Sequence, residues 1–353
     1  MSGGRGEREA TTRRAIEEEE DEAFSDDAVT DWAVWQLVDP LLPTGGFAHS
    51  QGLEAAAHAG LVAGGDERAT RRGEDVGWCV ETFAVEACRN AASMSIPFVE
   101  AARYTFAPLA KKRATTGTGT ATGTATGTDG GARSVSDADS VSAAVATWRS
   151  LDDRMGACLA GNHVASRAST ATGAALLRAA TAAFGDAESG GPGPDGGGVS
   201  YSAAEALRGA RRASRPGPVS ASAAASASAS PALRRPGGHL ATSFGAVAGS
   251  LGLSSARAAR LFAYLTLRDT LSAATRLNLV GPLRAGAALR RCSGRVEALA
   301  AEAARGAARA ARDAEARGGC GATAAAKRAA GSSPLVDVVQ GGHDALYSRL
   351  FSS

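Results

Sequence analysis

Histidine and cysteine are two residue types that commonly bind transition metals or act in nucleophilic catalysis. Five of each are present, at His49, His58, His163, His239 and His343 and at Cys79, Cys88, Cys158, Cys292 and Cys320. No two histidines have the spacing H-x-x-x-H, and no two cysteines have the spacing C-x-x-C. The first two histidines are nine positions apart, as are the first two cysteines, which would place each pair on opposite faces of a helix. We therefore expect no metal site within one segment, and the identity of any metal ligand stays open.

The motifs of nucleotide-binding proteins and of serine hydrolases are also missing. The chain has no G-x-x-x-x-G-K-[ST] and no G-x-S-x-G. A formal G-x-G-x-x-G runs from Gly191 to Gly196, but two prolines interrupt it and no strand precedes it. His49 stands next to Ser50, and adjacency alone does not give the geometry of a catalytic triad. We expect no catalytic residue, no stably bound cofactor and no enzymatic activity.

The elements that must position these residues have helical composition almost throughout, and persistent alternation of apolar and polar residues is missing. Asp31 could cap a short helix with Trp32, Trp35 and Val38 on one face, and Pro40 would end it. Ser50 could cap the next helix, which ends near Gly60. Further helices are expected at 76–94, 140–184, 240–251, 254–279 and 282–311. The sequence predicts an all-α protein, a single compact helical bundle of about ten helices.

The helix expected from residue 254 has the clearest pattern. Its apolar stripe, at a spacing of three or four residues, consists of Ala263, Leu267, Leu271 and Ala274. A polar ridge follows on another face, at Arg268, Ser272 and Arg276. These arginines could be solvated or paired with carboxylates of neighbouring helices. Alternatively, they could form a contact face for another subunit, since arginine offers planar, multidentate hydrogen bonding.

Composition divides the chain into a charged arm and a patterned domain. Residues 1–30 are predicted to be a disordered acidic arm, and residues 31–353 the helical domain. Low-complexity insertions are expected near 111–139, 185–200, 214–238 and 318–333, where Gly, Ala, Ser, Thr or Pro dominate. Long insertions of this kind are tolerated because loop-closure entropy grows only slowly with length.

Charge and cysteine usage limit the partners and the compartment. A formal charge of +2 over 353 residues gives no reason to expect nucleic acid as a partner. No apolar stretch approaches the roughly 20 residues that span a bilayer, so no membrane association is expected. The scattered, odd-numbered cysteines favour a reducing compartment, and the acidic run Glu17 to Glu22 is unlike a transit peptide. We expect a soluble, cytoplasmic protein.

One segment is more specific than composition or periodicity. Residues 42–54 read L-P-T-G-G-F-A-H-S-Q-G-L-E, in which Pro43 and a Gly-Gly pair, with Pro40 just before the block, join two expected helices. This block resembles the N-terminal signature of the UreF family of urease accessory proteins. Blocks at 151–152 with Asn162, at 174–179, at 271–283 and at 343–352 resemble the family in the same order, and the block at 93–99 is similar to plant and algal members. Unlike the family pattern, Gly341 and Gly342 precede the terminal block, so a more flexible approach to the tail is expected.

The resemblance implies a urease accessory protein that is required for maturation of urease by nickel insertion. It implies an all-α homodimer that binds the accessory protein UreD, also called UreH, and recruits the GTPase UreG to apo-urease. Nickel would be the delivered ion, and GTP would be bound by UreG. In an alternative, the chain is a GTPase-activating regulator of UreG with a direct contribution from Arg268 or Arg276. A helical adaptor unrelated to urease would fit the fold but leave the motifs unexplained.

The candidate partner-binding residues come from the signature block, the polar ridge and the tail. They are His49, Ser50, Glu54, Arg268, Ser272, Arg276, His343, Tyr347, Arg349 and Phe351. From Asp344 onward the sequence predicts two helical turns that present Tyr347 and Phe351 as docking anchors. The other possibility is that the tail lies on the protein's own core. If the tail docks on a partner, truncation after Gln340 is expected to leave the melting temperature nearly unchanged.

Overall fold

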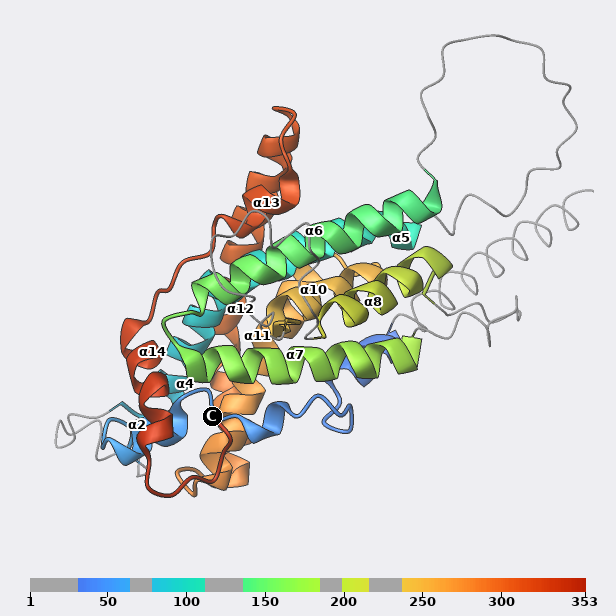
Figure 1. The fold of residues 1–353 in the computed structure, drawn as a ribbon. Coiled ribbons are helices and arrows are strands. Elements are labelled where there is room, and N and C mark those ends of the chain that lie inside the picture. Colours follow the sequence, from blue (N-terminus) through green and yellow to red (C-terminus); the bar gives the residue numbers. More distant parts are fainter. Residues whose placement is uncertain (1–30, 64–77, 112–135, 185–198, 216–236) are drawn as a thin grey trace, which may run out of the picture.

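The computed structural model describes residues 31–63, 78–111, 136–184, 199–215 and 237–353, and these residues form helices with no strand among them (Figure 1). The only extended pairing in this part of the chain is an isolated bridge between Val62 and Trp78. The prediction of an all-α fold is confirmed. The helices are α2 (Leu53–His58), α4 (Val80–Asn90), α5 (Ile96–Lys111), α6 (Asp137–Cys158), α7 (His163–Phe184), α8 (Tyr201–Ala213), α10 (Leu240–Ser250), α11 (Ser255–Arg276), α12 (Pro282–Glu315), α13 (Gly321–Ala326) and α14 (Pro334–Gly341).

Helix α10 is the centre of the bundle, and every residue from Ala241 to Ser250 is buried. It packs against α5 and α7. Gly245 and Gly249, one turn apart, make the contact with α5 possible. A Cβ at Gly245 would lie 2.3 Å from the carbonyl oxygen of Val99, and one at Gly249 would lie 2.5 Å from that of Arg103. Glycine is therefore required where the two backbones approach each other.

A carboxylate from another helix caps the N-terminus of α10. Asp152 of α6 accepts hydrogen bonds from the backbone amides of Gly238 and His239, at 2.6 and 2.8 Å, and from the hydroxyl of Thr242 at 2.6 Å. Such amides have no partner within their own helix, and a carboxylate at this end also interacts favourably with the helix dipole. Asp152 thus fixes α6 against the start of the central helix.

Helices α11 and α12 form an antiparallel pair along one side of the bundle. The four residues predicted to form the apolar stripe of α11 are all buried. Helix α12 buries Val296, Cys292 and a row of alanines, small side chains that allow neighbouring helices to approach closely. Between α4 and α5 a π-helical turn at Ala91–Ser95 joins two α-helices into one rod. Turns of this kind re-aim the side chains that follow them.

The short helix predicted at the start of the domain is present at residues 31–38. Val34 and Leu37 face the core, whereas Trp32 and Trp35 are exposed and stack edge to face at 5.2 Å. The helix therefore packs through Val34 and Leu37, and the face with the two tryptophans is open to solvent.

The segment near 318–333, predicted to be a disordered insertion, contains α13. Its alanines Ala322, Ala325 and Ala326 are buried, and the helix packs against α12 and α5. Small side chains suffice here because the neighbouring helices supply the apolar surface. The single helix expected over 140–184 is divided at residues 159–162 into α6 and α7. The arm at 1–30 and nearly all of the other three predicted insertions lie outside the described residues.

Candidate functional site

The signature block adopts a turn that needs glycine at several positions. Gly45 has φ 74°, a 3-10 turn spans Gly46–Ala48, and Gly52 has φ 85° as the residue before α2. A Cβ at Gly46 would lie 2.9 Å from Oδ2 of Asp269 on α11, and one at Gly52 would lie 2.9 Å from Cβ of Gln340 on α14. The loop is thus held between α11 and α14. Ser50 does not cap α2, since Gly52 occupies that position.

Glu54 is the centre of a buried polar cluster that joins the signature block to the tail of the chain. Its Oε2 lies 2.8 Å from Nε2 of His343 and accepts a hydrogen bond from the amide of Phe351 at 3.1 Å. Its Oε1 accepts a hydrogen bond from the amide of Leu350 at 2.5 Å. Both side chains of the Glu54–His343 pair are almost completely inaccessible to solvent. A buried carboxylate is stable only with such partners, so Glu54 fixes the path of the tail.

The residues before α2 hold the last residue of the described chain. The backbone amide and the hydroxyl of Ser50 donate to the carbonyl oxygen of Ser353, at 2.7 and 3.1 Å. Nδ1 of His49 lies 2.5 Å from Oγ of Ser353. The amide of Ser352 donates to the carbonyl of Ala48 at 2.8 Å. We call this set of contacts from His49, Ser50 and Glu54 to residues 343–353 the clasp.

A second layer of charged groups lies outside the clasp. The guanidinium of Arg167 on α7 forms two hydrogen bonds with Asp344, and Nε2 of His163 and the side chain of Arg349 also contact this carboxylate. Hydrogen bonding to Arg167 lowers the pKa of Asp344 well below its usual range. Asp344 therefore remains ionised and anchors the start of the tail to α7.

The polar ridge of α11 holds the clasp from its other side. Arg268 donates to the carbonyl of Val38 and pairs with its neighbour Asp269. Arg276 donates to the carbonyl of Phe47, and its guanidinium carbon stands 4.3 Å from the ring centroid of Phe351. A guanidinium at this distance from an aromatic face is attracted by the ring.

Both arginines of the ridge form contacts within the chain. In the part of the chain that the structure describes, neither pairs with a carboxylate of a neighbouring helix, which was one of the possibilities considered from the sequence. Backbone carbonyls of the signature block and a tail aromatic are the main partners of the two arginines, and the remaining pairing is to a residue of the same helix. Ser272 is exposed between them.

The prediction of a helical tail is wrong. After a short 3-10 turn at Gly342–Ala345, the chain is not helical, since the amides of Leu350 and Phe351 bond to Glu54 and not to carbonyls one turn earlier. The two predicted anchors consequently face different environments. Phe351 is buried and Tyr347 is fully exposed. Gly341 and Gly342, expected to loosen the approach to the tail, lie in α14 and in the 3-10 turn.

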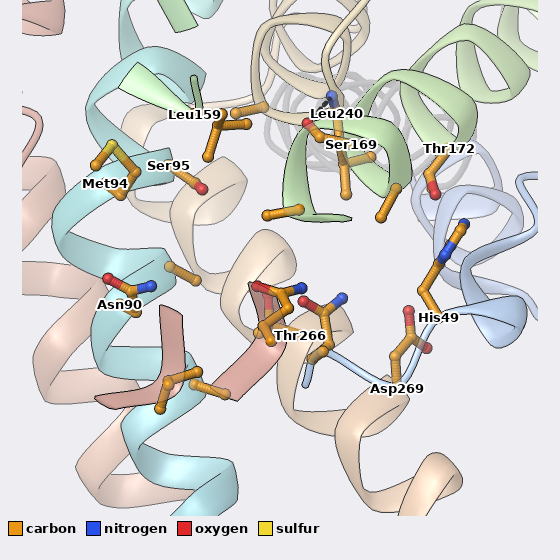
Figure 2. Close-up of a pocket in the computed structure, with 18 of the residues that line it drawn as sticks. His49, Asn90, Met94, Ser95, Leu159, Ser169, Thr172, Leu240, Thr266 and Asp269 are labelled. Carbon is orange, nitrogen blue, oxygen red and sulfur yellow. Dashed lines mark hydrogen bonds between the residues drawn. The ribbon is translucent and has the colours of Figure 1, made fainter. Parts of the chain in front are cut away.

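A polar cavity of about 130 Å³ lies between the signature block, the π-helical turn and α14. Figure 2 shows His49 and Asp269 on one side of this cavity and Asn90 and Met94 across from them. A larger, mostly apolar cavity of about 380 Å³ adjoins it, and Asp269 and Thr266 line both.

Burial changes the titration of groups around the polar cavity. It raises the pKa of Asp269 and of Asp337, although the Arg268 guanidinium opposes the first shift and a hydrogen bond from Asn90 opposes the second. Burial also lowers the pKa of His49, and the positive charge of Arg167 adds to this effect. His49 is therefore neutral at pH 7, and its Nδ1 forms one hydrogen bond with the hydroxyl of Ser353.

Metal binding and membrane insertion each require a particular arrangement of residues. Among the described residues, no group of three or more His, Cys, Asp and Glu side chains could hold a metal ion. In that same part of the chain, no helix is long and apolar enough to cross a membrane. The geometry does provide a fixed surface, because the buried polar cluster around Glu54 holds the exposed tail at residues 347–350 in place.

The structure brings most of the candidate residues together. His49, Ser50, Glu54, His343 and Phe351 meet in the clasp, Arg268 and Arg276 border it, and Tyr347, Arg349 and Ser272 lie at the surface around it. Whether any of them binds a partner stays a prediction. Sequence reasoning missed Arg167, Asp344 and Ser353. The sequence around Arg167 could not have indicated its role, because this residue lies in a helix of mostly small residues with no motif around it. Only the folded structure shows that it contacts Asp344.

Comparison with known proteins gives consistent results. The family model described as UreF matches residues 132–293. The chain is 30% identical over 322 residues to Urease accessory protein F of Arabidopsis thaliana, which covers 91% of this chain and 92% of that protein. It is 29% identical over 320 residues to Urease accessory protein F of Oryza sativa subsp. indica and of subsp. japonica, covering 91% of this chain and 84% of each relative.

Proposed function

Because this chain belongs to the UreF family of urease accessory proteins, and so acts in the maturation of urease, we propose that it is a non-catalytic scaffold in nickel insertion. In this proposal it links the accessory protein UreD/UreH and the GTPase UreG to apo-urease. Nickel is the cargo of the assembly, and UreG binds and hydrolyses GTP. A homodimer and a cytoplasmic location remain predictions that accompany the proposal.

The observation that carries the scaffold proposal is the way in which the clasp presents the tail. Phe351 is buried and Glu54 accepts hydrogen bonds from the backbone amides of Leu350 and Phe351, while Tyr347 is fully exposed a few residues earlier. An exposed aromatic on an irregular loop would normally lose much conformational freedom on binding. Fixing the loop beforehand lowers this cost, and large aromatic side chains are common energetic anchors at interfaces. We assign Tyr347, with the half-exposed Leu350 beside it, to the contact with UreD/UreH.

The alternative, direct stimulation of UreG by an arginine, has less support. An arginine that completes a GTPase site must reach the transferred phosphate. Arg268 is bound to Asp269 and to the carbonyl of Val38, and Arg276 is bound to the carbonyl of Phe47 and to the ring of Phe351. Both guanidinium groups would have to leave these partners. Their engagement therefore favours a role in holding the signature block and the tail.

Complementation tests the proposal. Cells that contain urease but lack their own UreF should regain urease activity when they express this chain, and the same cells expressing Tyr347→Ala should regain much less. The purified variant should keep its helical spectrum and melting temperature. Full activity with a variant that no longer co-purifies with UreD/UreH would contradict the scaffold assignment.

A further inference from the structure

The second half of α12 projects beyond its partner helix α11. Arg260 of α11 pairs with Glu297 of α12, and the two helices run antiparallel. The first residue of α11, Ser255, therefore lies at the level of about residue 302 of α12, and the rest of α12 continues for about 20 Å beyond it. In Figure 1 this end of α12, together with α13, stands out from the body of the bundle.

An arginine stripe runs along the solvent face of this projecting end. Arg305, Arg309 and Arg312 are spaced at i, i+4 and i+7, so their side chains leave the helix within an arc of about 60°. All three are exposed, on the face opposite the buried alanines of the same helix. The guanidinium of Arg328, which follows α13, reaches the same area, since it lies 3.7 Å from the position that a Cβ at Gly306 would occupy.

The stripe has no counter-charge to match it in the described part of the chain. None of these four guanidinium groups forms an ion pair there, and Lys327 next to Arg328 adds a further positive charge. The exposed carboxylates Glu302 and Asp313 flank the stripe and offset only part of its charge. An unpartnered face of this sign attracts an acidic ligand.

The chain itself contains a segment of complementary charge. Residues 17–22 are six consecutive carboxylates, and they precede the first described residue, Asp31, by nine positions or more. Asp31 pairs with Arg257 in the first turn of α11, which places it at the level of about residue 300 of α12. Nine to fourteen residues of chain extend to about 30–45 Å and span about 20 Å on average as a coil. The stripe begins about 8 Å further along α12, well within this reach.

We propose that the acidic run Glu17–Glu22 docks on the arginine stripe of its own chain, formed by Arg305, Arg309, Arg312 and Arg328. The contact is electrostatic and intramolecular, so it benefits from a high effective concentration and weakens with salt. In the docked state the arm covers the one strongly basic face of the projecting helix end.

Carbodiimide cross-linking of the full-length protein tests the contact, because the reagent joins carboxylates to lysine amines in direct contact. Lys327 is a native reporter beside the stripe, and Arg309→Lys places a second one within it. Arg178→Lys on α7 is the matched control, an exposed arginine away from the stripe. Mass spectrometry should find residues 17–22 joined to residues 327 and 309, with a yield at least about five times that for residue 178. The yield should fall at least about threefold between low salt and 0.5 M salt.

Two further comparisons decide which occupant is present. The double variant Arg305→Gln and Arg312→Gln should reduce cross-linking to Lys327 at least about threefold, whereas Arg212→Gln with Arg215→Gln, an equal loss of charge near the end of α8, should not. A mixture of isotope-labelled and unlabelled protein shows whether the linked peptides come from one chain. Links between different copies, equal yields at residues 309 and 178, or yields independent of salt would each overturn the proposal.

Discussion

Glu54 and His343 are 289 positions apart in the chain and meet at 2.8 Å in the protein interior. The same carboxylate accepts hydrogen bonds from two tail amides, so one acidic side chain of α2 determines where the last residues lie.

Glu54→Ala should destabilise the protein by about 3–5 kcal/mol, because the change leaves His343 and the amides of Leu350 and Phe351 buried without their acceptor. Urea unfolding followed by circular dichroism measures the loss. The matched control is Glu297→Ala, which removes an exposed pair with Arg260 and should cost about 1 kcal/mol or less. Equal effects of the two substitutions would show that the clasp adds no more than a surface ion pair.

The stability of the fold should decline as the pH falls from 7 toward 5. Burial lowers the pKa of His49 below its usual 6.5, so below about pH 6.5 the unfolded chain binds a proton that the folded protein resists. The contribution is complete above that pH and is lost as the pH falls through the lowered value. Arg167 and His343, which face His49 from α7 and from the tail, oppose its protonation.

His49→Gln should flatten this decline, measured as the free energy of unfolding at several pH values. His239, whose pKa burial also lowers, is present in both proteins, so the difference between the two curves reports His49 alone. The low pKa of Asp344 acts only in the more acidic range of a carboxyl group. Identical curves for the two proteins would mean that His49 is as easily protonated in the folded state as in the unfolded chain.

Arg268→Ala and Arg276→Ala should weaken assembly with UreD/UreH and UreG without changing the maximal rate of GTP turnover in complexes that form. The reason is that these side chains hold the signature block and Phe351. Titration of the partners separates the affinity from the maximal rate. A decrease of about 10³ in turnover at saturating partner would instead indicate that an arginine acts in the GTPase site.

Tyr347→Ala should weaken binding of UreD/UreH by about 30-fold, equivalent to about 2 kcal/mol, and leave the melting temperature unchanged because this side chain is exposed. Phe351→Ala is the comparison, since its ring is buried against Arg276 and its loss should lower the melting temperature. If both substitutions change stability alike and neither changes binding, the assignment of Tyr347 to the interface is wrong.

Truncation after Gln340 gives a different expectation from the one that the sequence suggests. Removing the tail deletes the partners of Glu54, His49 and Ser50, so the isolated protein should melt at a lower temperature even if the tail also serves as a docking element. Point substitutions in the tail therefore distinguish binding from folding better than truncation does.

The parts of this structure that the sequence predicted are those controlled by local pattern. The apolar stripe of α11 has a clear helical period, and burial follows directly from it. The signature motif located the segment around Glu54 and the terminal motif located His343 and Phe351. Neither motif could show that the two segments meet.

The errors have physical causes of the same kind. The tail contains apolar residues at helical spacing, but a two-turn helix is only marginally stable. The buried carboxylate of Glu54 is a better hydrogen-bond acceptor for the amides of Leu350 and Phe351 than the carbonyls of such a helix. The sequence grouped Trp32 and Trp35 on one face of the first helix but could not show which face is buried, and Val34 and Leu37 fill the space against the core. The alanine-rich segment at 318–333 has no clear helical pattern of apolar and polar residues. Helix α13 is stabilised by packing against the neighbouring helices, which the sequence does not show.

The clasp also has a consequence for the order in which the protein folds. Contacts between residues this far apart form late, because the entropy of closing so long a loop must be offset by structure that already exists between them. The helical bundle can assemble from pairs of neighbouring helices, whereas the bond between Glu54 and His343 needs both ends of the domain in place. The amides of Leu350 and Phe351 should therefore be among the last to gain protection from hydrogen exchange during refolding. Their protection would indicate that the whole domain has folded.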